Sequence, residues 1–117
     1  MKGYELIADF RRNKFADTSS KGFYNVQAYG FNALSTAALS YRNAIGPDSK
    51  PPVFWPFDLQ LWQPRDRVTN LVIAGALYQE AAEFKEKQKS DGSIYQHMAI
   101  AIAEEINELL AYELVAA

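Results

Sequence analysis

Apolar residues recur three and four positions apart in four segments of the chain, a spacing that places them on one face of an α-helix. The segments span residues 4–15, 22–44, 66–89 and 93–114. In the last segment, the apolar stripe consists of Tyr95, Met98, Ile102, Ile106, Leu109 and Leu110. We therefore expect an all-α, bundle-like domain of about four helices.

Residues at the edges of these segments are typical of helix ends. Gly46-Pro47 predicts the end of the second helix, because glycine adopts the left-handed conformation and proline cannot continue a helix. The third helix is expected to begin with Pro64 in its first turn or with Asp66 as its N-cap. Ser93 to Gln96 match a Ser-x-x-Gln capping box, which predicts Ser93 as the N-cap of the fourth helix.

Residues 46–66, here called the strap, depart from the helical pattern. They contain all five prolines and both tryptophans. Proline fixes φ and removes a backbone donor, so the strap is predicted to be an ordered, extended connection between the second and third helices. Its aromatic residues allow two interpretations: Trp55 and Trp62 anchor the strap to the core, or the strap forms an exposed binding surface, because tryptophan and arginine dominate interface hot spots. The binding candidates are Trp55, Phe57, Asp58, Trp62 and Arg65.

The composition fits one globular domain over residues 1–117, with 49% hydrophobic and 22% charged residues. The absence of cysteine excludes disulfides and thiolate metal ligands. The sequence shows neither a signal-peptide pattern nor an apolar run long enough to span a bilayer, which predicts a cytoplasmic protein without a membrane partner.

The net charge is −2, and the acidic residues concentrate in the last third of the chain. Nucleic-acid binding requires a continuous basic surface, so this distribution argues against a nucleic-acid partner. A homodimer is compatible with the sequence.

The candidate catalytic chemistry rests on carboxylates, because the only histidine, His97, cannot form a triad or a multi-histidine metal site within one chain. Residues 104–108, Glu-Glu-Ile-Asn-Glu, resemble the Glu-Glu-x-x-Glu helix of the MazG-like all-α nucleotide pyrophosphatases. That resemblance implies a Mg²⁺ site for a nucleoside triphosphate. Its catalytic candidates are Glu80, Glu83, Glu104, Glu105 and Glu108. The second motif of that family, Glu-x-x-Asp on a following helix, has no counterpart here, so a solvated acidic face without metal or cofactor is favoured.

A second resemblance covers residues 20–88. Trp55-Pro56-Phe57-Asp58, Trp62-Gln63-Pro64 and residues 70–77, Asn-Leu-Val-Ile-Ala-Gly-Ala-Leu, are similar to the core of a family of small bacteriophage and prophage proteins without a known activity. The resemblance implies a phage-encoded protein that acts in the host bacterial cytoplasm. Many members carry acidic residues and histidine at the start of the second helix, whereas residues 24–29 of this chain contain neither. Metal binding at that position is therefore not expected.

These observations favour a non-enzymatic protein that binds a host or phage protein, with a role against a bacterial defence system as one hypothesis. The alternative is a magnesium-dependent nucleotide pyrophosphatase.

Overall fold

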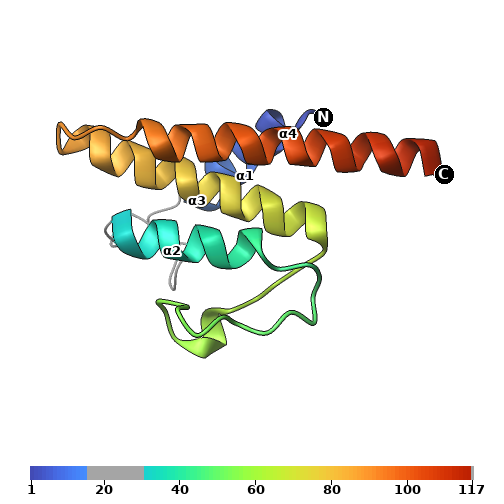
Figure 1. Ribbon diagram of the computed structural model, residues 1–117, viewed down its shortest axis with the longest axis horizontal. Helices are drawn as coiled ribbons and strands as arrows, with labels where there is room; N and C mark the ends of the chain where they lie inside the picture. The colour runs from blue at the N-terminus through green and yellow to red at the C-terminus, as the bar shows by residue number, and fades with distance from the viewer. Residues whose placement is uncertain (16–30, 117) are drawn as a thin grey trace.

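The computed structural model describes residues 1–15 and 31–116, which form helices and connections (Figure 1). The elements are α1 (Gly3–Phe10), continued by the π-helical turn η1 (Arg11–Phe15), then α2 (Phe31–Arg42), the 3-10 turn η4 (Leu59–Leu61), α3 (Arg67–Lys87) and α4 (Ser93–Ala116). No strand occurs in these two ranges, so the predicted all-α, bundle-like class is confirmed.

Three of the four predicted helices agree with the structure to within about two residues at each end. For the second helix, the predicted residues 22–30 lie outside the described part of the chain. This helix ends at Arg42, two residues before the predicted end at residue 44. The last turn tightens there, since the Ala44 N–H donates to the Tyr41 carbonyl three residues back. Arg67 Nη1 from α3 donates to the backbone oxygens of Arg42 and Ala44. The chain therefore leaves α2 before Gly46 and Pro47 are reached.

Helix α3 is the centre of the molecule (Figure 1). It packs against α2 on one side and α4 on the other, both of which run opposite to it, and α1 packs against α3 and α4. Every residue from Leu71 to Tyr78 is buried. Gly75 lies against α1, where an added Cβ atom would lie 2.5 Å from Ile7 Cδ1. The core therefore forms around α3, whose small residues let the neighbouring helices approach.

The ends of α3 are held by local hydrogen bonds. Asp66 is the N-cap of α3, which was one of the two starts predicted for this helix. Its Oδ2 accepts a 3.1 Å hydrogen bond from the backbone N–H of Thr69. At the other end, Lys89 adopts a left-handed conformation with φ of 58°. The Lys89 N–H donates to the Glu86 carbonyl and the Ser90 N–H to the Lys85 carbonyl, both at 2.9 Å. This pair of bonds is a Schellman motif.

The start of α4 differs from the prediction of a Ser-x-x-Gln capping box. Ser93 is the first helical residue rather than the N-cap, since the Gly92 carbonyl accepts from the backbone N–H groups of Tyr95 and Gln96. Gly92 takes this position because it packs against α3, where an added Cβ would lie 2.6 Å from the Ala82 carbonyl oxygen. Among the helices formed by residues 1–15 and 31–116, none is long and apolar enough to cross a membrane.

Candidate functional site

The two ends of the strap are joined by the buried side chain of Asn70 on α3. Its Nδ2 donates to the backbone oxygen of Ala44 at 3.1 Å and to that of Arg65 at 2.7 Å. Its Oδ1 accepts a 2.6 Å hydrogen bond from the Arg65 N–H. Asn70 is 0% exposed, and these three bonds satisfy both halves of its amide. One side chain thus fixes where the strap leaves α2 and where it enters α3.

An aromatic cluster holds the middle of the strap against α2. It consists of Tyr41 from α2 and Trp55, Phe57 and Trp62 from the strap. The Trp55 ring lies 5.0 Å from Trp62, 5.3 Å from Phe57 and 5.8 Å from Tyr41, centroid to centroid, each in an edge-to-face arrangement. Such pairs stabilise a fold by about 0.5–1.5 kcal/mol beyond the burial of area. Trp55 is therefore the central residue of the cluster.

Both indole N–H groups donate to strap carbonyls. Trp55 Nε1 donates to the Asp58 oxygen at 3.1 Å and Trp62 Nε1 to the Ser49 oxygen at 2.8 Å. Trp55 is only 8% exposed, which confirms its predicted burial, whereas Trp62 is partly buried at the edge of the cluster. The anchoring interpretation therefore holds fully for Trp55 and in part for Trp62.

Two apolar side chains project from the strap beside this anchor. The backbone N–H of Trp55 donates to the Pro52 carbonyl at 3.0 Å. This hydrogen bond closes a turn with Val53 and Phe54 at its centre. Val53 is fully exposed and Phe54 is 47% exposed. We call these two residues the strap tip. Their exposure on an ordered turn makes the strap tip a candidate binding surface.

The residues predicted for binding lie at different depths. Trp55 is buried, Phe57 and Trp62 are partly buried, and Asp58 and Arg65 are exposed. Sequence reasoning did not select Val53 and Phe54. Prolines on both sides of this pair were the available signal, because they favour a turn whose centre points away from the anchored residues.

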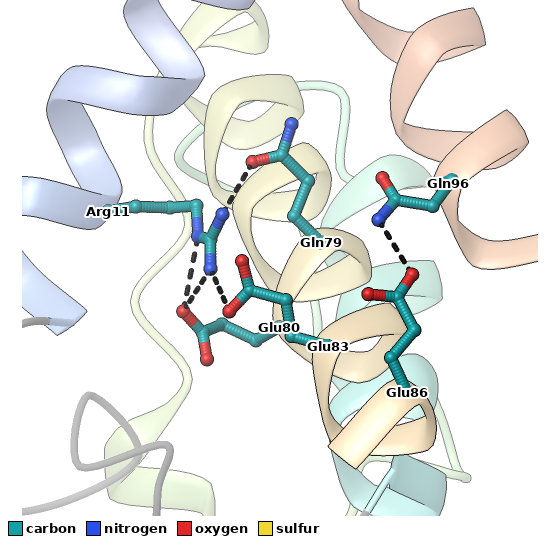
Figure 2. Close-up of polar contacts among 6 residues, drawn as sticks. All are labelled: Arg11, Gln79, Glu80, Glu83, Glu86 and Gln96. Carbon is teal, nitrogen blue, oxygen red and sulfur yellow. Dashed lines mark hydrogen bonds and ion pairs between the residues drawn. The ribbon is translucent and has the colours of Figure 1, made fainter. Parts of the chain in front are cut away.

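The carboxylates predicted as an alternative catalytic site fall into separate groups. Glu80 and Glu83 on α3 both face Arg11 (Figure 2), and Arg11 Nη2 lies 2.7 Å from an oxygen of each. Arg11 Nη1 also donates to Gln79 Oε1 at 3.1 Å. Burial alone would lower the pKa of Arg11, but the hydrogen bonds that its guanidinium donates to Glu83 and Glu80, together with the charges of these carboxylates, raise it above its usual value. This group is an ion-pair cluster that ties η1 to α3.

Glu105 belongs to a second arginine cluster. Its Oε1 lies 2.7 Å from Arg42 Nη2 and its Oε2 lies 3.9 Å from Arg67 Nη2. Glu104 and Glu108 are exposed, as predicted. Within the described ranges, no three His, Asp or Glu side chains are placed to hold one metal ion. The five acids of the alternative site are therefore divided between arginine partners and solvent.

Comparison of the chain with known family models, curated proteins and solved structures finds no significant match.

Proposed function

We propose that this chain is a phage-encoded, non-enzymatic protein that binds a host or phage protein in the bacterial cytoplasm, in the role of countering a bacterial defence system. The observation that supports binding is the strap tip, where Val53 and Phe54 are exposed on a turn that Trp55 anchors. A turn that is already ordered loses little conformational entropy when a partner covers it, so even a small apolar contact can contribute to affinity.

The phage origin rests on the resemblance carried by the strap and the start of α3. The motif residues Trp55, Trp62 and Asn70 are also the residues that hold the strap in place. A protein that shares the motif would keep the same anchors. The residues at the tip could then vary with the partner, because Val53 and Phe54 contribute little to the core.

Affinity purification from a phage-infected bacterial lysate tests the binding role. We expect the wild-type chain to retain a specific protein, and a Val53→Ser/Phe54→Ser double variant to lose it. Ile94→Ser is the matched control, since Ile94 is exposed on α4 and lies outside the strap. Equal recovery of the same protein by the wild type and the double variant would contradict binding through the strap tip.

The alternative, a magnesium-dependent nucleotide pyrophosphatase, requires several carboxylates around one ion. No observation among the described residues favours it, since Glu80, Glu83 and Glu105 already neutralise arginines.

A further inference from the structure

Helix α4 lies at the edge of the molecule, with α3 and α1 packed against one side of it (Figure 1). Ala99, Ile102 and Ile106 are buried on that side. Another set of α4 residues is exposed and consists of Ile100, Glu104, Glu108, Tyr112 and Val115. These five residues, here called the outer stripe, follow one another at helical spacings of three or four positions, so they lie along one side of the helix.

The outer stripe contains large apolar side chains that no described element covers. Ile100 is 56% exposed, Tyr112 72% and Val115 87%, and Leu114 beside them is 81% exposed. A helix that is apolar on several sides is normally buried, and a cluster of exposed apolar side chains marks an interaction site. The outer stripe is therefore expected to be covered by another surface.

The middle of the outer stripe is negatively charged. Neither Glu104 nor Glu108 forms an ion pair with a lysine or arginine in the described part of the chain. Helix α4 itself contains no lysine or arginine. Arg67 lines a groove beside Glu108, but its Nη2 atom already lies 3.9 Å from Glu105 Oε2. The stripe thus combines apolar side chains with two carboxylates that have no basic partner among these residues.

These two carboxylates decide which kind of surface can cover the stripe. In a two-fold dimer of antiparallel α4 helices centred on the stripe, Glu104 and Glu108 of the two copies would face one another, and like charges so placed repel. An anionic lipid surface or a nucleic acid would bring phosphates against the same carboxylates. A protein segment that carries lysine or arginine beside apolar side chains matches both properties of the stripe.

We infer that the outer stripe binds a basic amphipathic helix of another protein. The apolar side of that helix packs against Ile100, Tyr112 and Val115, and its lysine or arginine side chains face Glu104 and Glu108. A helix is the matching shape because the side-chain ridges of one helix fit into the grooves of another. The inference rests on the proposed role in binding a protein, but it uses a surface separate from the strap tip, since the strap lies on the side of α2 away from α4 (Figure 1).

An NMR titration of the ¹⁵N-labelled chain tests the stripe with a defined probe. The probe is a synthetic peptide of leucine and lysine, about 18 residues long, with its leucines at helical spacing. We expect saturable shift changes confined to the amides around residues 100–115. A peptide with glutamate in place of every lysine should bind at least about tenfold more weakly, because its charges repel those of the stripe. Equal binding of the two peptides, or shift changes centred elsewhere, would overturn the inference.

Two double variants separate the apolar from the charged contribution. Ile100→Ser/Tyr112→Ser should raise the dissociation constant of the lysine peptide about tenfold or more, and Ile94→Ser, on the first turn of α4, should leave it unchanged.

Glu104→Gln/Glu108→Gln should also weaken binding and should make it less dependent on salt. Its control is Glu86→Gln/Asp91→Asn, which removes two exposed charges near the other end of α4. Circular dichroism checks that each variant is folded. Wild-type affinity in both stripe variants would reject the assignment.

The other surfaces that could cover the stripe give different results. Self-association in sedimentation velocity that Tyr112→Ser abolishes would assign the stripe to a second copy. Binding to phosphatidylglycerol vesicles that the same variant abolishes would assign it to a lipid surface. Either result would overturn the inference. The Val53→Ser/Phe54→Ser variant should bind the lysine peptide as the wild type does, so the strap tip and the outer stripe can each fail their test without the other.

Discussion

At the scale of single residues, Asn70 is a fully buried polar side chain that connects separate parts of the chain. It lies among the buried apolar residues of α3, where an unpaired amide would be costly. Here its amide binds the backbone of both ends of the strap at once. The polar group is tolerated in the core because both halves of its amide are paired with backbone groups of Ala44 and Arg65.

Replacing Asn70 by Ala should therefore destabilise the protein by about 3 kcal/mol, since it leaves backbone groups of Ala44 and Arg65 without this partner. Chemical denaturation followed by tryptophan fluorescence measures the loss, and both tryptophans lie in the strap. Asn43→Ala is the matched control, because Asn43 is exposed. A loss of stability in Asn70→Ala similar to that of the control would contradict the role of Asn70 in holding the two sides of the strap.

Asp66 gives a pH-dependent prediction. A hydrogen bond from the Thr69 hydroxyl, and then backbone N–H groups of the first turn, hold its pKa below the ordinary value against an opposing effect of burial. A lowered folded-state pKa stabilises the fold above the unfolded pKa, about 3.9 for Asp. This contribution is lost as the pH falls through the lower, folded-state pKa.

Asp66→Ala should cost about 1 kcal/mol at neutral pH, the usual cost of removing an N-cap. Asp66→Asn keeps a side-chain oxygen at the N-cap and should lose less stability than Asp66→Ala. Thermal denaturation from pH 7 to pH 3 measures both effects. The difference in stability between the wild type and Asp66→Asn should become smaller as the pH falls. A difference that grows as the pH falls would refute the assignment.

At the scale of elements, the C-terminal end of α3 contains a strained backbone conformation. Lys89 occupies the left-handed position of the Schellman motif, where a side chain is strained and glycine is not. The tight link to α4 depends on this conformation and on Gly92, which lies against the Ala82 carbonyl.

Lys89→Gly should accordingly stabilise the protein by about 0.5–1 kcal/mol, because removal of the strain exceeds the entropy that glycine adds to the unfolded chain. Lys87→Gly is the control. Lys87 is the last residue of α3, and this variant should instead cost up to about 1 kcal/mol. Opposite signs of the two changes in melting temperature would support this account, and a loss of stability in both variants would contradict it.

The strap is the second element with a specific energetic prediction. Trp55→Ala should cost about 3–5 kcal/mol, because it empties the centre of the aromatic cluster. Trp62→Ala should cost less, because Trp62 is only partly buried. Urea denaturation compares the two, with Trp55→Phe as an intermediate variant. A near-wild-type stability of Trp55→Ala would remove the basis for an anchored strap tip.

At the scale of the whole molecule, arginine ion pairs connect the helices around α3. Arg11 joins η1 to α3, and Arg42 joins α2 to α4 through Glu105. Both arginines are partly buried, and both use carboxylates that a metal-dependent hydrolase would need for its ion. The distribution of charge therefore bears directly on the two functional hypotheses.

We expect no thermal stabilisation by millimolar Mg²⁺. A site filled to a hundred times its dissociation constant would stabilise the fold by about 2.7 kcal/mol. Differential scanning fluorimetry with Mg²⁺ and with Na⁺ at equal ionic strength provides the comparison. Magnesium-dependent hydrolysis of nucleoside triphosphates that is lost in Glu105→Gln would favour the pyrophosphatase over the interaction protein.

The pattern of apolar positions determined most of the fold. The 3.6-residue period located the first, third and fourth helices, and Asp66 was among the predicted caps, because these features depend on neighbours within one or two turns. The prolines and tryptophans of residues 46–66 likewise indicated an ordered strap with Trp55 inside. All of these interactions are encoded by residues close together in the sequence.

Tertiary structure alone decided the polar contacts and the exposed surfaces. The Asn70 side chain reaches Ala44, 26 residues away, and Arg11 reaches Glu80, 69 residues away. Glu105, in the segment that resembled a magnesium motif, acquired Arg42 as its partner for the same reason. The exposure of Val53 and Phe54, and of Leu114 near the end of α4, was not evident from the pattern of apolar positions. Periodicity shows that a side chain is apolar, but only the packed neighbours determine whether that side chain is covered.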